Sequence, residues 1–215
     1  MTYLQLVNKV LTRLREENVS TVSQTTYSAL IGEFVNDAKR AVENAWDWSS
    51  LYQTITANTS SGDYQYTLTD SGRYSTIETV INDTQNGFMH YRDRNWFENS
   101  LYNLDDTQAS PAYWGNDGID SNGDLKIRVF PKPDGVYALR FNIFKRQTEL
   151  SADADTLSIP WEPVMHLAVA LASRERGETG GTSAAELFGL ADVSLSDAVA
   201  MDANRTPEKL VFQEV

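Results

Sequence analysis

The sequence contains no cysteine. That absence excludes structural disulfides, thiolate metal ligands and thiol nucleophiles, and it is typical of a protein made in a reducing cytosol. Histidine is almost as scarce, because His90 and His166 are the only two in the chain. Neither has a second histidine three or four residues away, so we expect structural histidines rather than a zinc site.

Positively charged residues are also few compared with negatively charged ones. The chain has 18 Lys and Arg against 30 Asp and Glu, which gives a formal net charge of −12. A sequence-independent grip on nucleic acid needs clustered cations that neutralise phosphates, so the composition argues against one. Solubility is the plainest consequence of such an acidic balance, although an acidic wall would also suit DNA that has to slide past it.

Long apolar runs are missing as well. No stretch approaches the ~18 residues that a membrane-spanning helix needs. Polar residues appear by position 5, so no signal peptide is visible. We therefore expect a soluble protein that is made inside the cell and has no membrane contact.

Catalytic and cofactor motifs are absent too. No Gly-x-Ser-x-Gly element places a hydrolytic nucleophile. The stretch Asp120–Asp124 imitates a calcium loop, but Leu125 stands where the loop needs glycine and Pro131 where it needs glutamate. We expect an Asn-Gly turn there instead. The glycine-rich stretch 177–183 lacks the lysine of a phosphate-binding loop. We predict no enzymatic activity, no metal and no cofactor.

Helical periodicity marks the N-terminal end of the chain. Leu4, Val7 and Leu11 recur at helical spacing behind Thr2, which we expect to cap the helix. A second helix is expected to bury one stripe and to leave its charged positions in solvent. The stripe expected to be buried is Leu30, Phe34, Ala38, Ala41, Ala45 and Trp48, and the positions expected in solvent are Glu33, Asp37, Lys39, Arg40 and Glu43.

Two more helices are expected near the C-terminal end. One follows Pro160, and the other is capped by Thr182 or Ser183. Their apolar stripes are Trp161, Val164, Leu167, Ala168 and Leu171 in the first, and Ala184, Phe188, Ala191, Leu195, Ala198 and Met201 in the second. Four helices of this kind, two from each end, predict a four-helix bundle formed by residues 1–50 and 158–203.

Residues 51–157 predict an inserted antiparallel β-rich lobe, either an open sheet or a small barrel. Short strands are expected at residues 64–69, 77–81 and 88–91. The clearest hairpin is Leu125–Phe144. Its turn, Pro131–Gly135, combines the fixed φ of proline with a positive φ at glycine.

Two segments of this lobe carry aromatic residues. Arg94–Leu101 predicts a short helix that carries Trp96, and Tyr102–Gly118 predicts a long irregular segment that contains Tyr113 and Trp114. Loops of this length in compact domains are often functional or interfacial. We therefore take Trp96, Tyr113 and Trp114 as candidate interface residues.

The last segment, 204–215, contains Pro207 and has no helical period. Its apolar residues Leu210, Val211 and Phe212 have no evident local core, and exposed apolar groups of this kind indicate an interaction site. We predict an extended C-terminal arm. The complete prediction is an α+β fold with a four-helix bundle, an inserted β-rich lobe and this arm.

The seams between these parts resemble a known family. The motifs are Trp46-Asp47-Trp48-Ser49-Ser50-Leu51 at the first seam, the stretch Leu125–Tyr137, and Leu157-Ser158-Ile159-Pro160 at the second seam. Together with the order of elements over nearly the whole chain, they resemble the head-to-tail adaptor proteins of tailed bacteriophages. The resemblance is strongest to tail tubular protein A, the gatekeeper-ring adaptor of short-tailed phages.

This resemblance implies a structural protein of the virion neck that is assembled in the host cytoplasm and serves viral DNA ejection. Such proteins form a ring of identical copies, usually a dodecamer, between the portal protein and a tail nozzle protein of the tail tubular protein B kind. The ring extends the DNA channel, and DNA passes through without specific binding. The resemblance also implies that Leu210, Val211 and Phe212 anchor the arm on the portal.

A second hypothesis stays open. The 5 Trp and 10 Tyr are concentrated mostly in the middle lobe. Aromatic-rich loops are common in sugar-binding sites and also in protein interfaces. The chain would then be an aromatic-rich binding module of a virion or tail protein, with carbohydrate or protein as its ligand.

Overall fold

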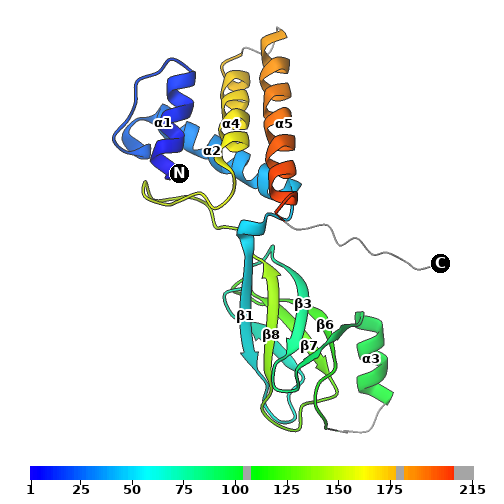
Figure 1. Ribbon diagram of the computed structural model, residues 1–215. Helices are drawn as coiled ribbons and strands as arrows, with labels where there is room; N and C mark the ends of the chain where they lie inside the picture. Colours follow the sequence, from blue (N-terminus) through cyan, green and yellow to red (C-terminus); the bar gives the residue numbers. More distant parts are fainter. Residues whose placement is uncertain (104–107, 178–181, 206–215) are drawn as a thin grey trace, which may run out of the picture. The chain divides into compact units, whose positions relative to one another are not determined.

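The chain divides into two compact units. A computed structural model describes residues 1–103, 108–177 and 182–205. One unit, which we call the helical unit, contains residues 1–50 and 147–215; the other, the β-rich unit, contains residues 51–146. Figure 1 shows the helices of the first and the sheets of the second. Residues 147–157, assigned from the sequence to the β-rich lobe, group with the helices instead.

Helix α1, Tyr3–Arg13, begins where the sequence predicts. Thr2 caps it, because its side chain accepts a hydrogen bond from the Gln5 backbone while the Gln5 side chain accepts one from the Thr2 backbone. This reciprocal pair satisfies two amide groups that the helix itself cannot pair. The apolar face of α1 is fully buried at Leu6, Val7 and Val10.

Helix α2, Thr26–Ala45, follows the short 3-10 turn η1, Val22–Gln24, and buries a stripe that matches the predicted one only in part. Ala38 and Trp48 of the predicted stripe are fully buried. The buried residues include Ile31, Val35, Ala38 and Val42, whereas Ala41 and Ala45 are exposed. Two stripes of α2 are apolar enough to face a core, and the branched aliphatic one is buried. The helix ends at Ala45 because Trp46 has an extended backbone. Trp48 is buried beyond the helix end, where its Nε1 donates to the Val42 carbonyl at 2.9 Å.

Two charged residues of α2 contradict the prediction that they lie in solvent. Lys39 and Glu43 are buried, with exposed fractions of 2% and 4%. Their side chains form an ion pair of 3.1 Å between Lys39 Nζ and Glu43 Oε1. Lys39 Nζ also donates to the Gln147 carbonyl at 2.7 Å. An i,i+4 pair of this kind normally lies on a solvated helix face. Here the pair is buried, and residues 147–159 contact this side of α2 through Gln147.

Residues 147–159, which we call the strap, run along the N-terminal helices. The Asn36 side chain pairs with both backbone groups of Leu150: its Nδ2 donates to the carbonyl and its Oδ1 accepts from the amide, each at 3.0 Å. Asp153 accepts from the Val22 amide at 2.9 Å, and the Asp155 carbonyl accepts from the Tyr3 amide at 2.8 Å. The strap therefore belongs to the helical unit through specific bonds that hydrophobic periodicity does not reveal.

Helix α4, Trp161–Glu175, lies at the centre of the helical unit. It contacts α1, α2 and α5, Thr182–Ala203. Fully buried Ala168, Ala170 and Ala172 allow neighbouring helices to approach closely. Helix α5 turns Ala191 toward the interior, but Met201, which the predicted stripe includes, is 74% exposed.

Over its described residues, 51–103 and 108–146, the β-rich unit contains two four-stranded sheets. The first has the order β1-β8-β3-β4 and the second the order β2-β7-β6-β5. All pairs are antiparallel except the parallel pair β5–β6. The strands are β1 Tyr52–Asn58, β2 Gln65–Leu68, β3 Thr76–Asn82, β4 Gly87–Phe88, β5 His90–Tyr91, β6 Tyr113–Ile119, β7 Leu125–Phe130 and β8 Ala138–Phe144. The 3-10 turn η2, Ser49–Leu51, precedes β1, and helix α3, Arg94–Asn103, lies between β5 and β6.

The predicted hairpin Leu125–Phe144 is wrong in its pairing. Both strands form, but β7 and β8 belong to different sheets, and the residues between them cross from one sheet to the other. Gly135 also lacks the predicted positive φ. Period-two alternation specifies which side chains point inward and does not specify the neighbouring strand. The inward residues of both sheets share one core, made of Leu68, Val80, Met89, Trp114, Leu125, Ile127, Val129, Leu139, Phe141 and Ile143.

The segment Tyr102–Gly118, predicted to be irregular, contains all of strand β6 except its last residue, Ile119. Its hairpin with β7 turns at Asp120–Asp124, as the Asn-Gly prediction requires. Gly123 has a φ of +92°, and Asp120 Oδ1 accepts from the backbone amides of Asn122 and Asp124 at 2.8 Å. Carboxylate-to-amide bonds of this kind stabilise a tight turn without any metal.

Candidate functional site

An aromatic cluster lies where α3 meets β6 and β7. Trp96 of α3 is half-buried and contacts Tyr113 of β6 and Phe130 of β7, with ring centroids 5.0 and 5.4 Å apart. Tyr113 and Phe130 are register partners across the β6–β7 ladder. The guanidinium of Arg92 lies 5.6 Å from the Trp96 ring and 5.2 Å from the Tyr113 ring. We call Arg92, Trp96, Tyr113 and Phe130 the aromatic cluster.

The structure brings together two of the three candidate interface residues of this lobe and separates the third. Trp96 and Tyr113 are both half-buried members of the cluster, whereas Trp114 is 7% exposed and belongs to the core between the sheets. Adjacent residues on a strand point to opposite faces, so Tyr113 and Trp114 cannot share a surface. The Trp114 ring contacts the ring of Tyr91 on the edge strand β5, with centroids 5.1 Å apart.

Sequence reasoning missed Arg92 and Phe130. Phe130 ends a strand in which Leu125, Ile127 and Val129 point inward, so the alternation itself places Phe130 on the outer face. Arg92 carries no comparable signal, because its position over the rings depends on the path of the chain between β5 and α3. A guanidinium over aromatic faces stabilises both partners and leaves its N–H groups available to a ligand.

An ion-pair network holds α3 against the second sheet. Arg128 of β7, which is mostly buried, pairs with Glu98 of α3 and with Asp117 of β6, the latter at 2.7 Å. The hydrogen bond from Arg128, and then its charge, hold the pKa of Glu98 below its usual range. The network fixes the helix that carries Trp96.

Gly115 supports the same packing, and its replacement gives a first prediction. An added Cβ would lie 2.5 Å from the Phe97 ring and 2.7 Å from the Arg92 carbonyl oxygen. Because that oxygen belongs to the backbone, Gly115→Ala must displace α3, and we expect it to cost about 1–3 kcal/mol of unfolding free energy. Gly87→Ala, whose Cβ would meet its nearest neighbour at 4.0 Å, is the control and is expected to be nearly neutral. Equal urea midpoints for the two variants would contradict this packing.

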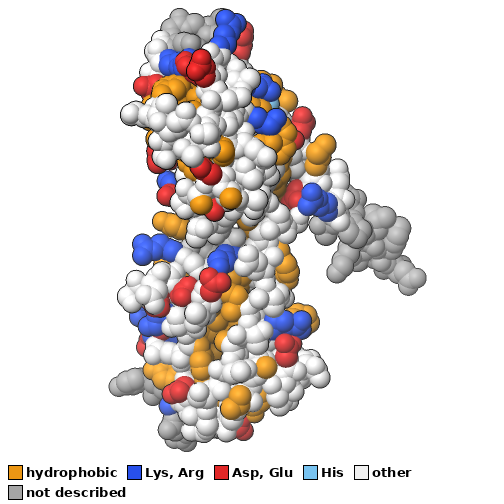
Figure 2. All heavy atoms as spheres, turned by 90° about the vertical axis from the view of Figure 1, so that its left-hand side faces the viewer, with side chains coloured by type: hydrophobic (Ala, Val, Ile, Leu, Met, Phe, Trp, Pro, Cys, Tyr) orange, Lys and Arg blue, Asp and Glu red, His pale blue; other side chains and the backbone are white. Residues whose placement is uncertain are grey.

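Other apolar side chains of the β-rich unit are also exposed. Figure 2 shows hydrophobic side chains among charged ones on one face of this unit. The largest exposed apolar side chains that the structure describes here are Tyr52, Tyr74, Phe88, Tyr91, Ile119 and Val136. Exposed apolar side chains are ordinary on a protein surface, so the aromatic cluster, with its packed rings and cation, is the better-defined surface.

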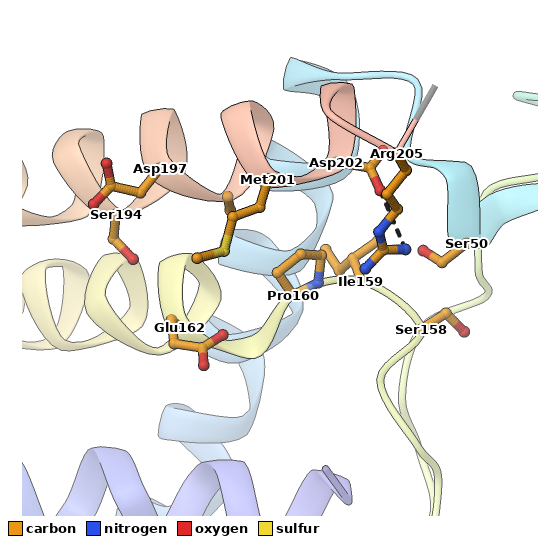
Figure 3. Close-up of a pocket in the computed structure, with 11 residues that line it drawn as sticks. Ser50, Ser158, Ile159, Pro160, Glu162, Ser194, Asp197, Met201, Asp202 and Arg205 are labelled. Atoms are coloured by element: carbon orange, nitrogen blue, oxygen red, sulfur yellow. Dashed lines mark ion pairs between the residues drawn. The ribbon is translucent and has the colours of Figure 1, made fainter. Parts of the chain in front are cut away.

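A pocket of about 490 Å³ lies at the C-terminal end of α5, within the helical unit. Figure 3 shows Met201, Asp202 and Arg205 on its α5 side and Pro160 and Glu162 on its α4 side. We call it the α5 pocket. The described chain ends at Arg205, which lines this pocket. The candidate arm residues Leu210, Val211 and Phe212 lie outside the described residues.

Asp202 anchors the end of α5 beside this pocket. Its carboxylate accepts hydrogen bonds from the Ser49 amide at 2.9 Å, the Ser49 hydroxyl at 2.6 Å and Trp46 Nε1 at 3.2 Å. Arg205 Nη1 lies 3.4 Å from the same carboxylate. Burial raises the pKa of Asp202, but the bonds from Ser49 and Trp46 outweigh that effect and hold the pKa below its usual range.

The lowered pKa of Asp202 gives a second prediction. A carboxyl whose folded pKa is depressed stabilises the fold above its unfolded pKa of about 3.9, and that contribution is lost as pH falls through the folded value. Asp202→Ala should therefore cost about 1–3 kcal/mol at pH 7 and progressively less below pH ~4. Urea unfolding at pH 7 and pH 3 measures this difference. A difference independent of pH would contradict it, and exposed Asp192→Ala is the near-neutral control.

Within residues 1–103, 108–177 and 182–205, no three His, Asp or Glu side chains are grouped so as to hold a metal ion. In the same residues, no helix is long and apolar enough to cross a membrane. His90 is exposed in the β-rich unit. His166 is half-buried on α4, and burial, followed by the nearby charge of Arg13, lowers its pKa.

Comparison with known proteins places the whole arrangement in one family. A sequence model of the SU10 adaptor protein family matches residues 1–208, which include both units. No curated protein matches the chain. A match of this extent covers every described helix and strand. The chain therefore belongs to the SU10 adaptor protein family, a family of structural head-to-tail adaptors of bacteriophages.

Proposed function

We propose that this protein forms a ring between the portal and the tail of a bacteriophage and extends the DNA channel there, in the manner of tail tubular protein A. The observation that carries the proposal is the family match over residues 1–208. The adaptor is a virion component of the neck, assembled in the host cytoplasm, and its ring is a dodecamer. DNA passes through it during ejection without specific binding, which agrees with a net charge of −12.

The division into two units supports a division of labour. In this proposal α1, α2, α4 and α5 act together as a four-helix bundle that builds the ring, and the C-terminal arm reaches the portal. The arm predicted at 204–215 is shortened to 206–215, because the Asn204 and Arg205 amides donate to the Ala200 and Asp202 carbonyls at the end of α5. Leu210, Val211 and Phe212 are the anchors of that arm. Arg205, the residue that precedes this segment, lines the α5 pocket.

The aromatic cluster is the proposed contact with the tail nozzle protein. Aromatic residues and arginine are enriched in the energetic centres of interfaces, and here Arg92 lies over the rings of Trp96 and Tyr113. Trp114 supports this surface from the core rather than contacting the partner. The same arrangement is the specific observation that favours the alternative function, an aromatic-rich binding module for carbohydrate or protein.

Replacing Trp96 with alanine separates these roles and gives a third prediction. Trp96→Ala should weaken binding to purified nozzle protein about thirtyfold or more and leave portal binding unchanged. Tyr74→Ala removes an exposed aromatic residue from the same unit and is the control, expected to bind normally. Unchanged nozzle affinity would contradict a tail-facing cluster. If Trp96→Ala keeps its nozzle affinity but loses binding to a glycan, the binding module would be favoured.

The ring itself is tested by mixing the protein with its portal and measuring the mass of the complex. We expect a complex of defined stoichiometry that contains one ring of this chain per portal ring. A chain that neither joins the portal nor assembles with itself, yet retains a glycan, would overturn the adaptor function in favour of the alternative.

A further inference from the structure

Helix α5 has an exposed apolar face. Leu190, Val193 and Met201 are 44%, 60% and 74% exposed. Val193, Asp197 and Met201 follow one another at steps of four residues, and Leu190 precedes Val193 by three, so all four lie on one side of the helix. Ala191, about 100° around the helix from Leu190, is buried. We call Leu190, Val193, Asp197 and Met201 the outer face of α5. Asp197 and Met201 also line the α5 pocket, so this face adjoins that pocket.

The charge of α5 has one sign. Its sequence, Thr182–Ala203, contains Glu186, Asp192, Asp197 and Asp202 and no Lys or Arg. Asp202 is buried and bonded to Ser49, whereas the other three carboxylates are exposed. The outer face of α5 therefore joins apolar side chains to negative charge, and a surface that carries basic and apolar groups would complement it.

Helix α1 carries the complementary surface. Its sequence, Tyr3–Arg13, contains Lys9 and Arg13 and no Asp or Glu. Both are exposed and lie one helical turn apart on the same side. Beside them is a hollow of about 420 Å³, whose lining includes Thr12 and the buried Met165 of α4. A protruding side chain of the size of Val or Met fits a hollow of this volume.

The two surfaces belong to two helices that flank α4. Both α1 and α5 contact α4, and Figure 1 shows them on either side of it. A surface on one side that complements a surface on another side gives a heterologous contact between copies, which repeats in one direction and closes into a ring when the rotation allows. Copies with a net charge of −12 repel each other, so contact is favoured where a basic patch meets an acidic one.

We propose that the outer face of α5 in one copy packs against the Lys9–Arg13 face of α1 in the next copy. The apolar side chains of α5 enter the hollow beside α1, and Asp197 lies near Arg13. The inference rests on the proposed ring and names the surfaces that build it. We take a second copy as the partner because the chain that carries the outer face of α5 also carries the basic residues and the hollow that complement it.

The absence of cysteine makes this contact directly testable. The full chain with Val193→Cys and Thr12→Cys should give, under mild oxidation or with a short bis-maleimide, a ladder of covalent dimers, trimers and larger species. We expect the ladder in assembled particles or in concentrated protein, and its largest species should equal the ring. Each single-cysteine variant should give at most dimers. Asn44→Cys with Thr12→Cys, which pairs α1 with the exposed side of α2, is the matched control.

Charge exchange provides a second readout. Asp197→Arg in the double-cysteine chain should reduce the ladder about tenfold or more, because like charges would then face each other. Adding Arg13→Asp should restore it. The circular dichroism spectrum of each variant checks the fold.

The outcomes separate this inference from the function on which it rests. A chain that occupies the neck of the particle but gives no more ladder than the control pair would overturn the α5–α1 contact and leave the adaptor function intact. Abundant dimers from Val193→Cys alone would also overturn it, because α5 would then meet α5. Absence from the particle would overturn the adaptor function itself.

Discussion

A chain shortened after Arg205 is expected to fold normally and to lose its attachment to the head. Arg205 is kept because its Nη1 donates to the Ser49 hydroxyl at 3.1 Å and pairs with Asp202. The deleted segment contains Leu210, Val211 and Phe212. Burial of such side chains contributes about 1.5 kcal/mol or more each, so their joint loss should weaken portal binding about a thousandfold or more.

Titration of purified portal with the shortened chain measures this effect. The triple variant Leu210→Ala, Val211→Ala and Phe212→Ala should reproduce the deletion, because the apolar side chains are the proposed anchors. Gln213→Ala changes a polar residue of the same segment and should bind almost normally. Portal affinity equal to that of the full chain would contradict the arm, and an altered unfolding midpoint would show that the segment has a structural role instead.

Removing the charge of Lys39 should have the largest effect on stability. Lys39→Met leaves the Glu43 carboxylate buried without its counter-charge, and breaking a buried pair from one side costs about 3–5 kcal/mol. It also removes the hydrogen bond to the Gln147 carbonyl, which ties the strap to α2. We therefore expect a large loss of unfolding free energy in urea.

The matched variants identify the cause. Lys39→Met combined with Glu43→Leu removes both charges and should recover most of the loss, because apolar replacements of a buried pair are often tolerated. Arg40→Met breaks the exposed pair with Glu149, whose side chains are 57% and 66% exposed, and should cost at most about 1 kcal/mol. If Lys39→Met costs no more than Arg40→Met, the pair does not hold the strap.

Features that depend on local sequence could be predicted. The cap at Thr2 and the turn at Asp120–Asp124 are each decided by residues within five positions of one another, so the pattern contains the whole interaction. The existence of the four long helices and the β7 and β8 strands follows from periodicity in the same way. The family resemblance drew on the same order of elements.

Features that depend on residues far apart in the sequence could not be predicted from it. The buried face of α2 depends on distant partners, because α1 and α4 contact this helix and the strap bonds to Asn36 and Lys39 from more than a hundred residues away. An i,i+4 Lys–Glu pair in sequence looks the same whether or not such a segment covers it. Strand alternation likewise gave the inward residues of β7 and β8 but not their assignment to separate sheets.

The candidate interface illustrates the same limit. The sequence pattern predicts that Tyr113 and Trp114 lie in a loop and share one surface. Both lie in strand β6, where adjacent side chains point to opposite faces. Phe130 joins Tyr113 through the β6–β7 register, and Arg92 joins both through the chain path before α3. A surface assembled from three elements becomes visible only when their pairing is known.

Imaging of the assembled particle tests the central claim most directly. We expect a closed ring of this chain between portal and tail, with α5 of each copy against α1 of the next and the channel running through the ring. A particle whose neck lacks this chain, or holds it elsewhere in the tail as isolated copies, would contradict the adaptor function.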